Sequence, residues 1–286
     1  MLQTIFTGAK NGLLLWFNTL LPSLLPFMIL TQVIISRQWA ARISGIFYPV
    51  LHRLFGLSRN GCFPFVIGLL SGYPVGAKTC ADLKRQGLIS REEGQFLLSL
   101  CNNASPPFIL TFVAGQCLNL PAHAFALLLL MHLSVILASV ILRVCSHKRG
   151  WYFPESVRSD RGPCVPFMTA LDNAIMSSFE VITKVGGYVI LFSIAVLLLK
   201  PFIPAAFLGI LEITTGTAAL SGVSLSAGLA FTAAAAVITF GGLSALAQTK
   251  SVLSGSGLSI RPYFLTKALA ALLACGLSYG YALAFL

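Results

Sequence analysis

Long apolar segments constrain the fold of this chain more than any other feature of its sequence. They lie at residues 13–35, 61–78, 94–117, 121–145, 183–199, 201–220, 227–250 and 263–286. A helix needs about 20 apolar residues to cross a bilayer, and most of these segments reach or approach that length. Only 9% of the residues are charged and the mean hydropathy is +0.87, so the chain cannot cover the surface of a soluble domain. We therefore predict an all-α polytopic membrane protein in contact with the lipid bilayer.

Two of the apolar segments, 61–78 and 201–220, are interrupted by glycine and proline. Gly72, Pro74 and Gly76 fall in the second half of the first of them. Short or interrupted apolar segments in corresponding positions of two halves point to the binding site of a transporter. We predict that both segments are re-entrant hairpins, which return to the side of the membrane from which they enter.

A weak internal repeat relates the two halves of the chain. Residues 67–70 (IGLL) align with 208–211 (LGIL), Gly76 aligns with Gly216, and 101–105 align with 240–244. Identities are few, so the distribution of charge is needed as a separate test of this duplication.

Lysine and arginine gather in the loops 36–60, 78–93 and 143–165. If the N-terminus is outside and the interrupted segments are hairpins, all three loops are cytoplasmic, as the positive-inside rule requires. Only Lys10 and Lys200 of the 19 lysines and arginines are then left outside, with Lys267 counted at or near the cytoplasmic side. Three crossings in each half invert the second half relative to the first. We therefore predict six crossings, two re-entrant hairpins and both termini outside.

The predicted organisation is two repeats joined by a basic cytoplasmic linker at 146–165. The first repeat, 1–145, contains the crossings 13–35, 94–117 and 121–145 and the hairpin 61–78. The second repeat, 166–286, contains the crossings 183–199, 227–250 and 263–286 and the hairpin 201–220. An apolar stretch at 43–57 contains proline, histidine and arginine and is expected to be a short interfacial helix. Ser90 and Glu93 form the pattern of a capping box at the start of the next helix.

The first candidate site combines SGYPVGAK with CNNASPPFIL. Its candidate substrate-binding residues are Ser71, Gly72, Tyr73, Pro74, Gly76, Lys78, Asn102, Asn103 and Ser105. Glycine and proline end a helix and leave backbone groups unpaired, which at membrane depth is tolerated only where the backbone is buried or lines a cavity. Such backbone, helix N-termini and amide side chains suit a polar solute. The alternative is a pair of ordinary helix ends joined by interhelical hydrogen bonds.

The second half contributes Glu212, Thr214, Thr215 and Gln248. An acid inside an apolar segment is costly, and Glu212 is therefore the candidate for coupling a proton or Na⁺. Alternatively, a protonated Glu212 packs against a neighbour without a functional role. Lys78 either attracts an anionic substrate or extends its ammonium group toward the cytoplasm.

Other chemistry finds no support in the sequence. The seven cysteines form no CxxC pair, and no HExxH, GxSxG, Walker or dinucleotide-binding motif occurs. The net charge of +11 is spread over short loops, without the basic stripe and interleaved aromatics that bind nucleic acid. We therefore expect no enzyme activity, no cofactor, no bound metal and no nucleic-acid partner.

The motifs SGYPVGAK, ADLKRQGLISREEG, CNNASPPFI and LEITTG, in that order, resemble those of the YlbJ-type sporulation integral membrane proteins. These proteins are members of the nucleoside-recognition (Gate) domain superfamily, and the resemblance covers essentially the whole chain. It implies a fold similar to the concentrative nucleoside transporters, with inverted repeats, re-entrant hairpins and broken helices that meet at mid-membrane.

The same resemblance implies a function in a bacterial cell membrane. In a spore-forming bacterium this would be the forespore membrane derived from the mother cell, and the substrate would be dipicolinic acid, a small organic dianion. Two alternatives stay open: an ion-coupled symporter of nucleosides or nucleobases, and a sporulation scaffold that transports nothing. Transporters of similar fold are often oligomers, and only this analogy points to a homo-oligomer.

Overall fold

The computed structural model describes residues 1–145, 152–153, 165–204 and 207–286, and these residues are helical without strands. Five of the described helical segments are long and apolar enough to cross a membrane. They are Leu2–Ser36, Pro121–Cys145, Phe167–Leu199, Ala227–Val252 and Ile260–Phe285. The chain is thus a multi-pass membrane protein, as the sequence predicts.

The first half begins with one long, bent helical segment. It consists of α1 (Leu2–Leu15), the π-helical turn η1 (Trp16–Leu20) and α2 (Leu21–Ser36). Two short helices follow, α3 (Ala40–Ser44) and α4 (Tyr48–Phe55), where one short helix over 43–57 is predicted. Then come α5 (Cys62–Ser71), α6 (Val75–Arg85), α7 (Arg91–Cys101), η2 (Phe108–Cys117), η3 (Pro121–His123) and α8 (Ala124–Cys145).

The second half has α9 (Phe167–Leu199), α10 (Leu208–Leu211), α11 (Ile213–Leu220), α12 (Ala227–Phe240), α13 (Gly242–Val252) and α14 (Ile260–Phe285). Both predicted hairpin segments are divided near their middle. The first division lies between Ser71 and Val75, and the second lies at Glu212, whose backbone is extended.

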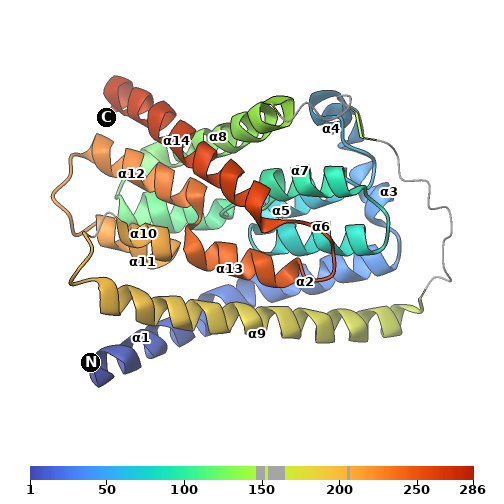
Figure 1. Ribbon diagram of the computed structural model, residues 1–286, viewed down its shortest axis with the longest axis horizontal. Helices are drawn as coiled ribbons and strands as arrows, with labels where there is room; N and C mark the ends of the chain where they lie inside the picture. The colour runs from blue at the N-terminus through green and yellow to red at the C-terminus, as the bar shows by residue number, and fades with distance from the viewer. Residues whose placement is uncertain (146–151, 154–164, 205–206) are drawn as a thin grey trace.

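The helices run along the long axis of the molecule, and both termini lie at the same end (Figure 1). Helices α3 and α4 lie at the opposite end, where α8 ends and α9 begins. The pair α5–α6 lies toward that end, whereas α10 and α11 lie toward the end with the termini. The two divided segments therefore approach the middle of the molecule from opposite ends.

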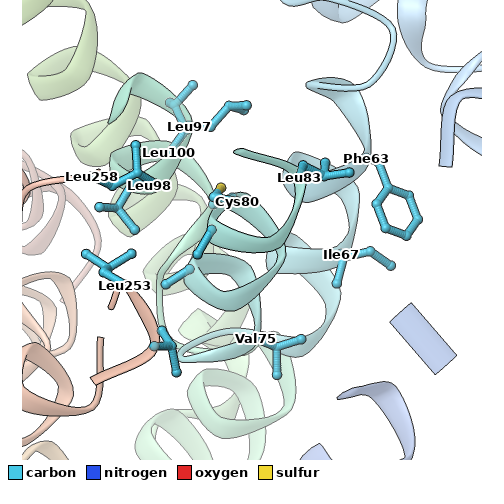
Figure 2. Close-up of a cluster of buried hydrophobic side chains, with 14 of the residues drawn as sticks. Phe63, Ile67, Val75, Cys80, Leu83, Leu97, Leu98, Leu100, Leu253 and Leu258 are labelled. Atoms are coloured by element: carbon cyan, nitrogen blue, oxygen red, sulfur yellow. The ribbon is translucent and has the colours of Figure 1, made fainter. Parts of the chain in front are cut away.

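Two apolar cores hold these elements together. The first packs α5, α6 and α7 against α2 and the loop that follows α13. Figure 2 shows part of it, with Cys80 of α6 lying among leucines of α7 and of the 253–258 loop. The second core joins η2 and α8 to α11, α12 and α14. Close packing, rather than exclusion of water, stabilises such contacts inside a membrane.

Several boundaries differ from the predicted ones. The segment 94–117 is not one continuous helix, because the chain leaves helical geometry between Cys101 and the two prolines at 106–107. Helix α9 begins at Phe167, well before the predicted crossing 183–199, and α6 continues to Arg85 beyond the predicted hairpin. Most of the predicted linker 146–165 lies outside the described residues.

Ser90 caps α7, as its sequence pattern predicts. Its hydroxyl accepts a hydrogen bond from the Glu93 amide at 3.0 Å. The Glu93 carboxylate, however, reaches the previous loop, where it accepts hydrogen bonds from the amide and the hydroxyl of Ser58 at 2.7 and 2.9 Å. The capping box is therefore half formed, and its acid anchors the start of the first hairpin instead.

Candidate functional site

A cavity of about 510 Å³ lies where the divided helices meet. It is lined by the turn between α5 and α6, the 104–108 stretch, η2, the Glu212 turn and α13, with η1 and α2 along one side. Its volume is in the range of small-molecule sites. Because both halves contribute to its wall, relative movement of the halves would change its shape.

The first hairpin turn is fixed to the break after α7 by its backbone. The Tyr73 amide donates a hydrogen bond to the Asn103 carbonyl oxygen at 2.8 Å. Gly72, with φ of +75°, lies so close that a Cβ atom there would be 2.8 Å from the Ser105 nitrogen. A glycine is needed at this position for both its backbone angle and the close approach.

The second hairpin turn is built around Glu212, which is buried. Its carboxylate accepts hydrogen bonds from the Thr214 amide at 2.9 Å and from the amide and hydroxyl of Thr215, both at 2.7 Å. It therefore caps the first turn of α11, where negative charge is stabilised by the helix dipole. This turn packs against the break between α12 and α13, because a Cβ atom on Gly242 would be 3.1 Å from the Gly209 oxygen.

The cavity wall offers polar atoms that are free to bind a solute. The Ser71 hydroxyl is buried and has no hydrogen-bond partner among the described residues. The side chain of Tyr73 also lines the cavity, and its hydroxyl makes no hydrogen bond to a described residue. The side-chain amide of Gln248 donates a hydrogen bond to the Ser244 hydroxyl at 3.1 Å, which leaves its side-chain oxygen available. Buried polar atoms normally have partners, so an unpaired hydroxyl in a cavity wall favours a ligand or water there.

Apolar groups make up much of the remaining wall. Phe108 and Phe112 line the cavity and stack on each other with ring centroids 5.2 Å apart. Among the described residues that line the cavity, Glu212 is the single Asp, Glu, Lys or Arg. The site therefore combines an aromatic wall with hydroxyl, amide and carboxylate groups.

The structure brings together about half of the predicted site residues. The predicted residues that line the cavity are Ser71, Tyr73, Ser105, Glu212, Thr214 and Gln248. Those that are not part of its lining are Gly72, Pro74, Gly76, Lys78, Asn102, Asn103 and Thr215.

Asn102 and Asn103 bind neighbouring helices instead. The Asn102 amide donates hydrogen bonds to the hydroxyl of Thr249 at 2.8 Å and of Tyr263 at 2.9 Å. The Asn103 amide oxygen accepts a hydrogen bond from Lys267 at 2.7 Å. These contacts match the alternative of interhelical hydrogen bonds, and they hold the break in place behind the cavity.

Lys78 is neither in the cavity nor extended toward water. Its ammonium is buried and forms an ion pair with Asp82 at 2.9 Å. Asp82 also pairs with Arg85 at 2.6 Å and accepts a hydrogen bond from Gln32. Lys78 therefore contributes to a buried polar network between α6 and α2.

Lys267 is a further residue at the site, although its sequence context places it among the charges at or near the cytoplasmic side. The structure places this lysine in α14, fully buried and in contact with the break after α7. The signal in the sequence is its position seven residues inside a membrane-spanning helix that begins at Ile260. Among the described residues no cluster of histidine, cysteine and acidic side chains is arranged to hold a metal ion.

Comparison with known proteins gives one informative similarity. The chain is 26% identical over 311 aligned positions to the sporulation integral membrane protein YlbJ of Bacillus subtilis (strain 168). The alignment covers 93% of this chain and 75% of that protein, and it confirms the predicted resemblance to YlbJ-type proteins. No protein-family profile matches the chain. No solved structure matches it either, so likeness to nucleoside transporters stays a prediction.

Proposed function

We propose that this multi-pass membrane protein is a secondary transporter of a small organic solute and has no enzymatic function. The observation that carries the proposal is the cavity of about 510 Å³ at the meeting point of two hairpin turns and a helix break. Irregular backbone at membrane depth is characteristic of the substrate sites of transporters. Exposure of this cavity first to one side and then to the other would move the solute.

An inverted repeat is part of the proposal. In each half a hairpin turn packs on the break of a later helix, Gly72 near Ser105 and Gly209 near Gly242. Gly68 and Gly76 approach each other in the first hairpin, and the aligned glycines 209 and 216 approach each other in the second. The hairpins also approach the centre from opposite ends (Figure 1). These features support duplication with inversion.

Dipicolinate is the first substrate to test, in line with the similarity to a sporulation protein. Its flat ring suits the aromatic wall formed by Phe108 and Phe112. Since Glu212 is the single charged residue found in the described lining, we propose that the dianion enters protonated or together with a cation. The same observation favours a second candidate, a nucleoside or nucleobase whose N–H groups donate to Glu212 and Gln248.

Uptake into proteoliposomes tests the proposal. Purified wild-type protein should give saturable uptake of labelled dipicolinate. An excess of unlabelled nucleoside is added in a parallel assay as a competitor. Tyr73→Phe should raise the dipicolinate concentration at half-maximal uptake about tenfold, because it removes one free hydroxyl from the cavity wall. The stability of the protein should not change. Tyr279→Phe is the matched control, since Tyr279 is exposed on α14.

Each result assigns a different function. Dipicolinate uptake that is impaired in Tyr73→Phe and normal in Tyr279→Phe would support the anion transporter. Uptake of labelled nucleoside alone would support the second candidate. Absence of flux for both solutes in well-folded protein would refute these two transport functions and favour a membrane scaffold.

A further inference from the structure

Lys267 places a side-chain amino group inside the packed part of the protein. It lies on α14, one helical turn after Tyr263, and its side chain is buried. Its Nζ donates to the Asn103 amide oxygen at 2.7 Å and lies 5.8 Å from the centre of the Tyr263 ring. Keeping an ammonium ion buried costs several kcal/mol even in a relaxed site, so a lysine at this position requires an explanation.

The described acidic residues do not supply the usual counter-charge. Lys267 takes part in none of the ion pairs Lys78–Asp82, Arg85–Asp82 and Lys184–Glu180. Lys267 therefore interacts with a neutral amide, whereas Lys78, which is also buried, has a carboxylate partner. A structural role alone would be filled at lower cost by a neutral side chain.

The location of Lys267 is at the carboxyl end of a broken helix. Helix α7 ends at Cys101, where its last carbonyl groups lose their helical partners. Asn103 donates to the Leu100 oxygen at 2.6 Å, and Tyr263 donates to the Asn102 oxygen at 3.0 Å. Such a helix end carries partial negative charge and attracts cations, and in transporters with broken helices it is a place where coupling ions bind.

Lys267 is also connected to the cavity. Lys267 donates a hydrogen bond to the side-chain oxygen of Asn103. The backbone oxygen of Asn103 accepts a hydrogen bond from the Tyr73 amide. Tyr73 lines the cavity. Displacement of the ammonium group would thus be transmitted through one residue to the tip of the first hairpin.

We propose that the Lys267 ammonium is a resident cation, which occupies the place of a metal ion at the α7 break and positions the tip of the first hairpin. It is a positioning residue, because Asn103 stands between it and the cavity. Closure of the first hairpin then needs no Na⁺ at this break. The inference rests on the proposed transport function for its meaning, but its test needs no transported solute.

Hydrogen–deuterium exchange of the purified protein measures this role directly. Lys267→Met keeps the length and removes the charge, and it should speed exchange of the peptide around Tyr73 about tenfold or more. Lys267→Arg should retain most of the protection. Lys184→Met is the control, because Lys184 pairs with Glu180 on the exposed face of α9. In the wild type, protection should be equal in sodium and choline chloride.

Chemical rescue separates charge from packing. In Lys267→Ala, propylammonium should restore protection at the Tyr73 peptide, whereas propanol, of similar size but neutral, should not. Asn103→Asp is a second variant that should still fold, since it gives the ammonium a carboxylate partner. Protection should rise in this variant if Lys267 is charged and fall if it is neutral.

The proposal is overturned if Lys267→Met exchanges like the wild type at the tip, or if Asn103→Asp lowers protection. It is also overturned if wild-type protection is lost when choline replaces sodium. Absence of solute flux in proteoliposomes would instead refute the proposed function and leave these exchange results interpretable.

Discussion

Gly68 shows how closely single residues set the packing of the first hairpin. A Cβ atom at this position would overlap the Cys101 carbonyl oxygen at the end of α7. We expect Gly68→Ala to destabilise the protein by about 1–3 kcal/mol, since neither backbone can move without disturbing the cavity. Thermal unfolding in detergent measures this effect. Gly187→Ala, where a Cβ meets no atom within 4 Å, should leave the apparent Tm unchanged.

Glu93 is a second single residue that fixes the packing of the first hairpin, because its carboxylate binds the loop before α5. Glu93→Ala would leave the Ser58 amide and hydroxyl without their carboxylate acceptor. We expect a loss of about 1.5–3 kcal/mol, as for a buried hydrogen bond to a charged group. Denaturant unfolding of Glu93→Ala and of Glu92→Ala, whose side chain is exposed, provides the comparison. Equal stability of the two variants would contradict the anchoring role of Glu93.

Residue types in the sequence predicted part of the site but not the partner of each side chain. Glu212 is predicted because an acid inside an apolar segment is unusual, and Ser71 because glycine and proline break the helix beside it. Asn102 and Lys78 have the same signal, yet they bind Thr249 and Asp82. Which polar groups meet each other depends on the packing of α13 and α6, which residue spacing does not determine.

At the level of elements, Arg85 joins two helices that are far apart in sequence. Its guanidinium donates to the Val252 oxygen at 2.8 Å and to the Ser254 oxygen at 2.6 Å, at the carboxyl end of α13. Arg85→Ala should increase deuterium uptake in the peptide 252–259, because the carbonyl groups lose a cationic cap. Lys84→Ala tests whether loss of a neighbouring positive charge is enough to increase deuterium uptake in the peptide 252–259. Comparable uptake in both variants would refute a specific contact of Arg85.

Helix ends were more predictable than helix lengths. Glycine and proline end α5 within the predicted hairpin, because backbone geometry is a local property, whereas the predicted crossing 94–117 is interrupted after Cys101. The start of α9 at Phe167 was missed, since its first turns are too polar to be recognised as part of a membrane span. Polar residues do not prevent a helix from extending beyond the apolar layer, so hydropathy locates the membrane better than it locates helix ends.

For the whole molecule, the arrangement predicts that both termini face the side opposite the basic loops. Alkaline phosphatase fused after Leu286 should be active, because it would lie outside the cytoplasm, and green fluorescent protein at the same place should be dark. Fusions to a chain that ends at Ser259, before α14, should give the reverse pattern, since one crossing is removed. Identical patterns for the two lengths would contradict the topology.

The hairpin turns are held at their breaks by backbone atoms and by side chains that lie behind the cavity. The Tyr73 amide, the Asn103 carbonyl and the Gly242–Gly209 approach do not involve the side chains that face a solute. Mutations at lining positions other than Glu212, whose carboxylate caps α11, therefore leave these contacts in place. If the proposed transport function is correct, relatives at about 26% identity are expected to share the mode of movement of the hairpins more than the transported solute.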